Sequence, residues 1–158
     1  LASDSIFYVK LGDSWLKRCN IYGGIEEYLC YELFNSISFI NSNIGYGIDG
    51  SELHKTTDGG VSWNTIGTHN FGFTLASNFD FVSENIGYIL SGGWLYKTTN
   101  GGVDWGQVSQ ISISNMQFTS NSTGYAFFSN MIYKTTDGGV SWNMLNNNSK
   151  NLSLFSFF

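Results

Sequence analysis

The residues that could carry out catalysis are few, and the carboxylates are the first to consider. Hydrolysis of a glycosidic bond needs two carboxyl groups about 5 to 9 Å apart, one acting as an acid and the other as a base or nucleophile. Six carboxylates are candidates for these roles: Glu26, Glu27, Glu32, Asp49, Glu52 and Glu84. Nothing in their spacing pairs them. The sequence therefore offers residues for glycoside hydrolysis but no motif for it.

Residues that bind metals or act as nucleophiles also lack a motif. Neither His54 nor His69 lies in a metal-ligand spacing. Cys19 and Cys30 lie eleven positions apart without histidine neighbours, which argues against zinc and leaves either a disulfide or two free thiols. Nucleophile elbows and glycine-rich phosphate loops do not occur in the sequence. We therefore expect neither a metal nor a cofactor.

The composition favours an all-β protein that does not bind nucleic acid. The 158 residues are 42% hydrophobic and 17% aromatic, with 19 glycines and no proline, which suits short strands joined by glycine turns. Seven basic against 12 acidic residues give a net charge of −5, so the positive surface that binds phosphates is missing. The sequence contains no window of 18 consecutive apolar residues, so it predicts no membrane-spanning helix.

A frame of fixed spacing occurs three times along the chain. Its last part is a nonamer, found at 55–63, 97–105 and 134–142. Before each nonamer lie a phenylalanine and a Gly-Tyr pair, with the Phe and Gly at Phe39 and Gly45, Phe81 and Gly87, and Phe118 and Gly124. In every copy there are 6 residues from Phe to Gly, 10 from Gly to Lys and 8 from Lys to Trp. Only the connection from each Trp to the next Phe varies in length.

Each frame predicts four short strands. One ends near the Phe, one contains Gly-Tyr, one contains Lys-Thr-Thr and one passes through the Trp. The last two are expected to be joined tightly, with Asp58, Asn100 and Asp137 accepting hydrogen bonds from N–H groups two or three residues on. The tryptophans are expected to pack between the outer strands. Repeated four-stranded units of roughly 40 residues are the signature of a β-propeller.

The nonamers resemble the Asp-box, also called the bacterial neuraminidase repeat. They follow its pattern Thr-x-Asp-x-Gly-x-x-Trp, except that Asn100 takes the Asp position in the middle copy. The whole frame is most similar to the photosystem-assembly-factor-like (YCF48-like) branch of these propellers. Because such a motif occurs once per blade, a structural role is expected for its residues: Thr56, Asp58, Gly60, Trp63, Asn100, Gly102, Trp105, Asp137, Gly139 and Trp142.

The resemblance implies binding more than catalysis. Sialidases with this repeat hold a substrate carboxylate with several arginines, and Arg18 is the only arginine here, which excludes that activity for this chain alone. We expect a non-catalytic binding or scaffolding module of an exported bacterial protein, secreted, periplasmic or on the cell surface, that recognises a protein or a carbohydrate. The alternative is a carbohydrate-active enzyme, a glycoside hydrolase or a fragment of one.

The frames predict a single propeller domain or propeller fragment over 1–158. Its three full blades are expected at about 33–66, 74–108 and 112–145. Residues 1–18 and 151–158 together would form a split blade, with 19–32 as an inserted loop. The sequence leaves open a four-bladed ring and a part of a larger propeller completed by further chain or by a second copy.

The candidate ligand-binding residues lie on connections at the end of the blades opposite the Asp-Gly-Gly turns. The loop 19–32 combines tyrosines with glutamates, which suits a sugar or a basic protein partner; the alternative is a hairpin that only covers the first blade. The tail of the motif is also copied at Gly12-Asp13-Ser14-Trp15, so Trp94 is the one tryptophan outside it. Trp94 either stacks on a ligand or packs on a neighbouring strand. The predicted set is Tyr22, Glu26, Glu27, Tyr28, Asp49, Glu52 and Trp94.

Overall fold

The computed structural model describes the repeated part of the chain almost completely. It describes residues 34, 36–50, 52–68, 78–113, 115–128 and 131–146, with the backbone of 6–11, 15–20 and 25–26. The chain forms two compact units, residues 1–69 and 70–158. The regular elements of these described ranges are all strands, and the paired strands are antiparallel.

The first sheet of the N-terminal unit has three strands. Strand β1 (Ile6–Leu11) pairs with β2 (Trp15–Asn20), which pairs with β3 (Ile25–Glu26). The prediction of an inserted loop over 19–32 is therefore wrong for its first part. Cys19 belongs to β2 and is the register partner of Ile25, because a further strand satisfies the backbone groups on the outer edge of β2.

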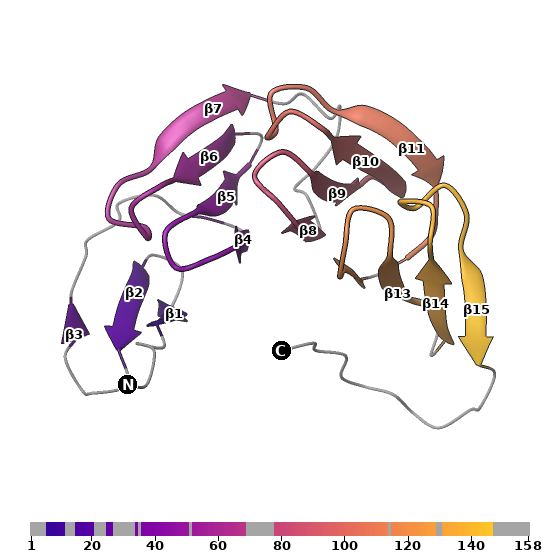
Figure 1. The fold of residues 1–158 in the computed structure, drawn as a ribbon, viewed down its shortest axis with the longest axis horizontal. Coiled ribbons are helices and arrows are strands. Elements are labelled where there is room, and N and C mark those ends of the chain that lie inside the picture. Colours follow the sequence, from indigo (N-terminus) through magenta and orange to yellow (C-terminus); the bar gives the residue numbers. More distant parts are fainter. Residues whose placement is uncertain are drawn as a thin grey trace. The chain divides into compact units, whose positions relative to one another are not determined.

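Three four-stranded sheets follow, and in each the strands lie in chain order, as the repeats predict (Figure 1). The N-terminal unit contains β4 (Ser36–Phe39), β5 (Gly45–Asp49), β6 (Glu52–Thr56) and β7 (Asn64–Thr68). The C-terminal unit contains β8 (Asn78–Phe81), β9 (Gly87–Ser91), β10 (Trp94–Thr98) and β11 (Gly106–Gln110). Its second sheet contains β12 (Asn115–Phe118), β13 (Gly124–Phe128), β14 (Met131–Thr135) and β15 (Asn143–Asn146).

A phenylalanine ring over a glycine joins the two inner strands of each sheet. Phe39 and Gly45 are register partners, and a Cβ on Gly45 would lie 2.5 Å from the Phe39 ring. The corresponding distance is 2.7 Å both at Gly87 beside Phe81 and at Gly124 beside Phe118. The ring thus occupies the space of a side chain, so only glycine fits beside it. This contact explains why the Phe-to-Gly spacing is constant.

The tryptophan of each repeat lies just before the outermost strand. Its ring packs edge to face on the phenylalanine of the innermost strand, with ring centroids 5.8 Å apart for Trp63 and 5.9 Å apart for Trp105 and Trp142. The prediction that it packs between outer strands is wrong. The turn before it folds back onto the connection between the first two strands, where Gly59 N donates to Asn43 O at 2.8 Å, and this brings the indole to the inner strand.

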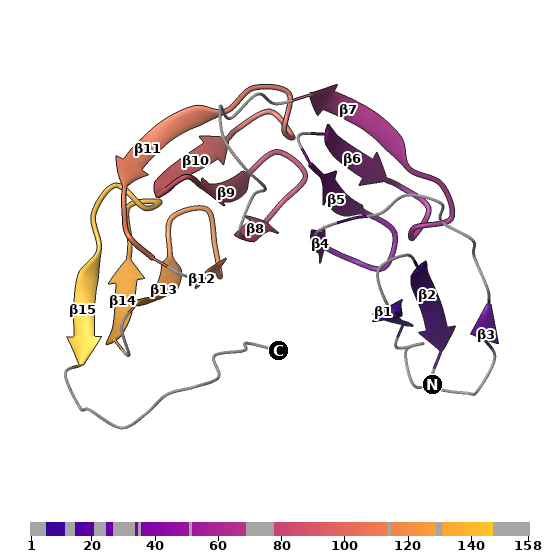
Figure 2. The ribbon, with the colours of Figure 1, turned by 180° about the vertical axis from the view of Figure 1, so that it is seen from behind.

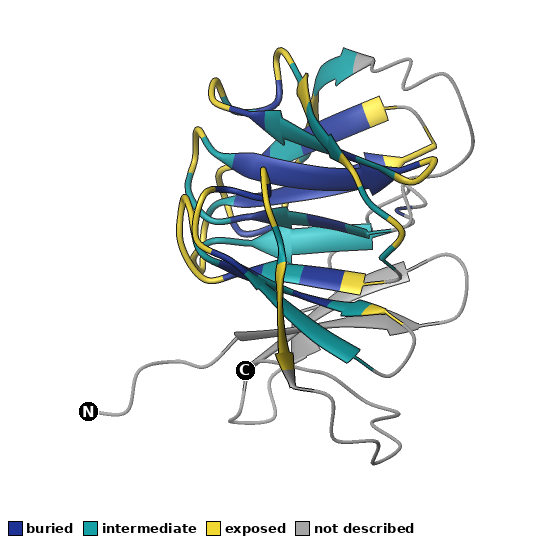
Figure 3. Ribbon diagram, turned by 90° about the vertical axis from the view of Figure 1, so that its right-hand side faces the viewer, coloured by how far each residue is buried: buried dark blue, intermediate teal, exposed yellow. Residues whose placement is uncertain are grey.

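The two sheets of the C-terminal unit pack face to face around one core. Tyr88 stacks on Phe118 with ring centroids 3.5 Å apart, and the inner strands β8 and β12 are neighbours (Figures 1 and 2). Asp80 Oδ2 accepts a 2.8 Å hydrogen bond from Phe118 N. The buried cluster consists of Tyr88, Leu90, Leu95, Met116, Phe118 and Ala126. Buried residues lie mainly in the inner strands of each sheet, and exposed ones lie in the connections and along the outermost strands β11 and β15 (Figure 3).

Candidate functional site

A threonine hydroxyl organises the turn between the third and fourth strands of each sheet. Thr56 Oγ1 accepts hydrogen bonds from Gly60 N at 2.8 Å and Asp58 N at 3.3 Å, and donates to Asp58 Oδ1 at 2.7 Å. Asp58 then accepts from Ser62 N at 2.9 Å and from Ser62 Oγ at 2.6 Å. The third turn repeats these bonds with Thr135, Asp137, Gly139 and Ser141.

These bonds confirm that Asp58 satisfies turn N–H groups, but the prediction was incomplete in one detail and wrong in another. The 2.9 Å bond comes from the N–H four residues on, at Ser62, while the predicted partner three residues on, Val61 N–H, also lowers the pKa of Asp58. Thr56 takes the N–H groups nearer than these. The connection is also no tight hairpin, since residues 57–63 separate β6 from β7. Threonine is therefore as central to the turn as aspartate.

The middle turn keeps the same bonds, but in the side-chain bond between its first and last polar residues donor and acceptor are exchanged. Asn100 Oδ1 accepts from Thr98 Oγ1 at 3.0 Å and from Asp104 N at 2.9 Å, which confirms that the amide oxygen takes the aspartate's place. Asn100 Nδ2 donates to Asp104 Oδ2 at 2.9 Å. In the other turns an aspartate accepts from a serine, whereas here an asparagine donates to an aspartate. The sequence comparison missed this exchange because it considered position 100 alone.

The carboxylates of the two aspartate turns are fully used by these internal bonds. Both oxygens of Asp58 accept hydrogen bonds from its own turn, as do both oxygens of Asp137. Across the described ranges, no group of three or more His, Cys, Asp or Glu side chains could hold a metal ion. The hydrogen bonds of these carboxylates thus stabilise the turn that connects the third and fourth strands of the sheet.

The turns should make the fold sensitive to acid. Hydrogen bonds from the Ser62 and Ser141 hydroxyls lower the pKa of Asp58 and of Asp137 from 3.8 to about 2. A carboxyl whose pKa is lower in the folded state stabilises the fold above its unfolded pKa and loses this effect as pH falls through the folded value. We expect the unfolding midpoint in urea to fall between pH 4 and pH 2. A variant with Asp58→Asn and Asp137→Asn should show a smaller fall; an equal fall would contradict the assignment.

The predicted ligand-binding residues that the structure describes lie at the hairpins between the second and third strands. Asp49 and Glu52 are both exposed and are register partners across the β5–β6 hairpin. Trp94 begins β10, is partly exposed and is paired with Ser91 across the β9–β10 hairpin. Glu84 is exposed in the connection between β8 and β9.

The remaining predicted residues are not placed. Tyr22, Glu27, Tyr28, Glu32, Cys30 and His69, and the segment 151–158, lie outside the described residues, and for Cys19 and Glu26 only the backbone is described. The two alternatives for Cys19 and Cys30, a disulfide or two free thiols, therefore stay open, and the role of the 19–32 segment in recognition stays a prediction.

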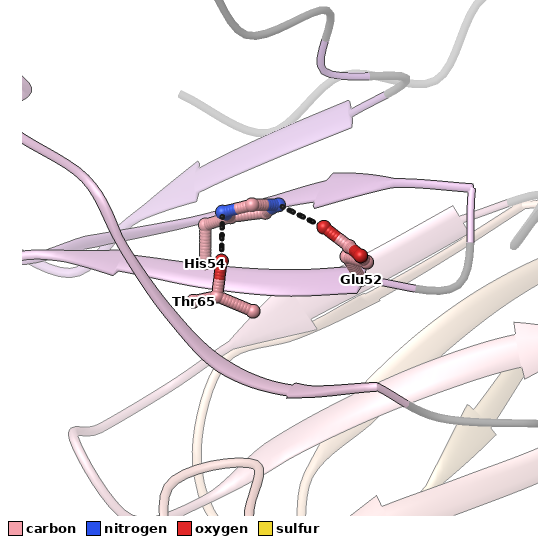
Figure 4. A network of polar contacts seen from close by, with 3 residues as sticks. All are labelled: Glu52, His54 and Thr65. Atoms are coloured by element: carbon pink, nitrogen blue, oxygen red, sulfur yellow. Dashed lines mark hydrogen bonds and ion pairs between the residues drawn. The ribbon is translucent and has the colours of Figure 1, made fainter.

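Near the acidic hairpin, Glu52, His54 and Thr65 form a polar contact that sequence analysis did not single out (Figure 4). His54 Nδ1 lies 3.2 Å from Thr65 Oγ1, and His54 Nε2 lies 3.7 Å from Glu52 Oε2. His54 is buried within β6, as expected for a strand side chain. The Phe34 ring packs on its imidazole with the two ring centroids 5.3 Å apart. Burial beneath Phe34 favours a structural role, since a substrate could not reach the imidazole. The clue in the sequence was that His54 replaces Tyr96 and Tyr133 of the other repeats.

The hairpin of the last sheet adds two apolar residues that sequence analysis missed. Phe128 is 38% exposed and is the register partner of Met131, directly opposite. The β9–β10 and β13–β14 hairpins lie at the same end of the packed sheets, because Asn78 and Asn115, which start β8 and β12, are joined there by a 2.7 Å hydrogen bond. Trp94, Phe128 and Met131 thus stand at one end of the C-terminal unit; we call this the hairpin end.

Four-stranded antiparallel sheets that pack face to face define the blades of a β-propeller, and solved structures show the same fold. YCF48 bound to D1 peptide is 24% identical with a TM-score of 0.57, over 68% of this chain and 38% of that one. YCF48 from Cyanidioschyzon merolae is 18% identical with a TM-score of 0.61, over 85% and 50%. An ancestral GH74 enzyme is 18% identical with a TM-score of 0.61, over 90% and 22%.

The chain has the fold of the YCF48-like and GH74 propellers, and it spans half or less of the length of these three structures. At these identities the likeness shows the fold alone. No protein-family model and no curated protein matches the sequence. No helix that could cross a membrane occurs in the part of the chain that the structure describes.

Proposed function

We propose that the chain is a non-catalytic binding module of an exported protein and that it recognises a polypeptide through its hairpin end. The observation that carries this proposal is where the repeats differ. The Phe-Gly contacts and the threonine-centred turns recur in all three sheets. The hairpins between the second and third strands instead differ from sheet to sheet. The β5–β6 hairpin carries Asp49 and Glu52, the β9–β10 hairpin carries Trp94, and the β13–β14 hairpin carries Phe128 and Met131. Variable side chains on a constant scaffold are typical of recognition surfaces.

The chemistry of the hairpin end suits a polypeptide. Trp94 and Phe128 offer partly exposed aromatic surface, and such residues dominate binding energy at protein interfaces. In the N-terminal unit the exposed pair Asp49 and Glu52 adds negative charge to its own hairpin, which favours basic groups on a partner. A solved neighbour, YCF48, is bound to a D1 peptide, which supports a polypeptide partner over a sugar.

The second candidate function is a carbohydrate-active enzyme or a fragment of one. It is supported by the likeness to GH74 propellers, including the xyloglucanase of Xanthomonas campestris at 15% identity and a TM-score of 0.57. Asp49 and Glu52 are register partners on adjacent strands of one hairpin. A retaining or inverting pair must instead flank a substrate from two sides, so this arrangement gives the enzyme less support.

The binding proposal is tested by selecting peptides from a displayed random library on the intact chain. We expect the selected peptides to lose at least about 10-fold in affinity for Trp94→Ser and for Phe128→Ser, measured by titration, with little change in melting temperature. The matched control is Val103→Ser, because Val103 is 59% exposed on a turn at the other end of the sheet. Selected peptides that bind all three variants equally would refute the hairpin end as the site. Turnover of xyloglucan oligosaccharides would favour the enzyme.

A further inference from the structure

One face of each four-stranded sheet carries the same set of side chains. In the sheet β8–β11 this face contains Tyr88, Leu90, Leu95 and Lys97, whose side chains lie on one side of β9 and β10. Their equivalents in β4–β7 are Tyr46, Ile48, Leu53 and Lys55, and in β12–β15 they are Tyr125, Phe127, Ile132 and Lys134. The lysine lies over the tyrosine ring in every sheet, at 5.2 to 5.7 Å from the ring centroid.

In the C-terminal unit the structure shows which strand packs on this face. In the C-terminal unit the face of β8–β11 is covered by β12, whose Phe118 stacks on Tyr88 while Met116 enters the same buried cluster. Tyr88 Oη and Lys97 Nζ both donate to the carbonyl of Asn121, at 2.6 and 3.2 Å. The partner is thus an inner strand with two apolar residues at alternate positions, the second a phenylalanine.

Burial distinguishes the three copies of the face. Tyr88, Leu90 and Leu95 are at most 2% exposed, and so are Tyr46, Ile48 and Leu53. Tyr125, Phe127 and Ile132 are partly exposed. These three residues match the buried ones of the other two sheets in type and in register. Burying them would therefore release water from a comparable apolar surface.

The end of the chain has the sequence of such a partner strand. Residues Phe155-Ser156-Phe157 repeat the pattern of Met116-Gln117-Phe118, and Trp142 precedes Phe157 by 15 residues, between the 13 and 18 found for Phe118 and Phe81. The segment 151–158 has no charged residue, so burying it on an apolar face leaves no charge unpaired. It carries the same apolar, uncharged chemistry as the strand that covers β8–β11.

We propose that Tyr125, Phe127, Ile132 and Lys134 form a docking surface for the chain's own residues 151–158, with Phe157 stacked on Tyr125 as Phe118 stacks on Tyr88. Phe155 then takes the place of Met116, beside Phe127. The C-terminal segment is therefore part of the folded module.

The test is a double-mutant cycle in the intact chain, read by urea unfolding. Tyr125→Leu and Phe157→Leu each keep apolar volume but remove the ring stacking, so both variants should still fold. A stacked pair should give a coupling of about 2- to 10-fold in the unfolding equilibrium constant. The matched control is Phe158→Leu, because adjacent residues of a strand point to opposite faces; it should be additive with Tyr125→Leu.

The outcomes separate the possible occupants. Coupling of Tyr125 with Phe157 that is unchanged over a hundredfold range of protein concentration supports docking within one chain. Coupling that appears only at high concentration would assign the surface to a second copy and overturn the proposal. Additive effects for both phenylalanines would overturn it too, since the segment would then make no contact with Tyr125.

Discussion

Replacing Gly139 by alanine is expected to lower the stability of the protein by about 3 kcal/mol, from the combined costs of a strained backbone and a steric clash. Gly139 has a φ of +89°, and a Cβ there would lie 2.2 Å from Leu95 Cδ2. Leu95 is fully buried in the core of the C-terminal unit, so it can move away only by displacing other core residues. The expected fall in melting temperature is about 6 to 12 °C.

Gly93→Ala provides a matched control for this substitution. Gly93 has a φ of +79°, but no atom lies within 4 Å of the position of its Cβ. Its replacement should therefore cost only the backbone strain, about 1 to 2 kcal/mol. Adding Leu95→Val to Gly139→Ala should restore part of the lost stability, because it shortens the clashing side chain. Equal losses for the two glycine variants would mean that the contact with Leu95 is unimportant.

Replacing Asn100 by aspartate is expected to destabilise the protein by about 1 to 2 kcal/mol at low salt, although aspartate is the residue of the other two turns. Asn100 Nδ2 donates to Asp104 Oδ2 at 2.9 Å. A carboxylate at position 100 would lose this hydrogen bond and face the charge of Asp104 instead. The effect should shrink in 1 M salt, because exposed charges are screened.

The rescue experiment is the sharper part of this prediction. Asn100→Asp combined with Asp104→Ser recreates the pair seen at Asp58 and Ser62, and it should recover the original unfolding midpoint to within about 0.5 kcal/mol. Asp104→Ser alone should have a small effect, since a serine hydroxyl can accept from the Asn100 amide. If the single and double variants melt together, charge repulsion at this turn is negligible.

Repetition made the fold predictable. The three frames with one spacing predicted four strands each, and Phe39, Phe81 and Phe118 do end the innermost strands. The tryptophans were misplaced because hydrophobic pattern alone cannot show that a turn folds back across its own sheet. β3 was missed because Ile25–Glu26 is too short for any pattern to be visible.

The candidate site was less predictable, because the proposed binding surface consists of positions where the repeats differ. Trp94 was singled out in the sequence because it lies outside the repeated motif, and its role in binding stays a prediction. Phe128 and Met131 were not singled out, because an apolar residue at a strand end resembles core until its exposure is known. The contact of Glu52 with His54 depends on side chains two residues apart on one strand, and their positions follow from tertiary packing.

The exchanged pair in the middle turn also constrains how the repeats could have diverged. Aspartate with serine and asparagine with aspartate are both complementary, but one residue must change before the other. Asparagine with serine keeps a hydrogen bond, since a hydroxyl both donates and accepts, whereas two aspartates repel. After the blades duplicated, the evolutionary route between the two pairs therefore passes through asparagine and serine, whichever pair is ancestral. Within this chain the intermediate between two residue pairs can be inferred from the direction of one hydrogen bond, whereas the order of the two substitutions depends on which pair came first.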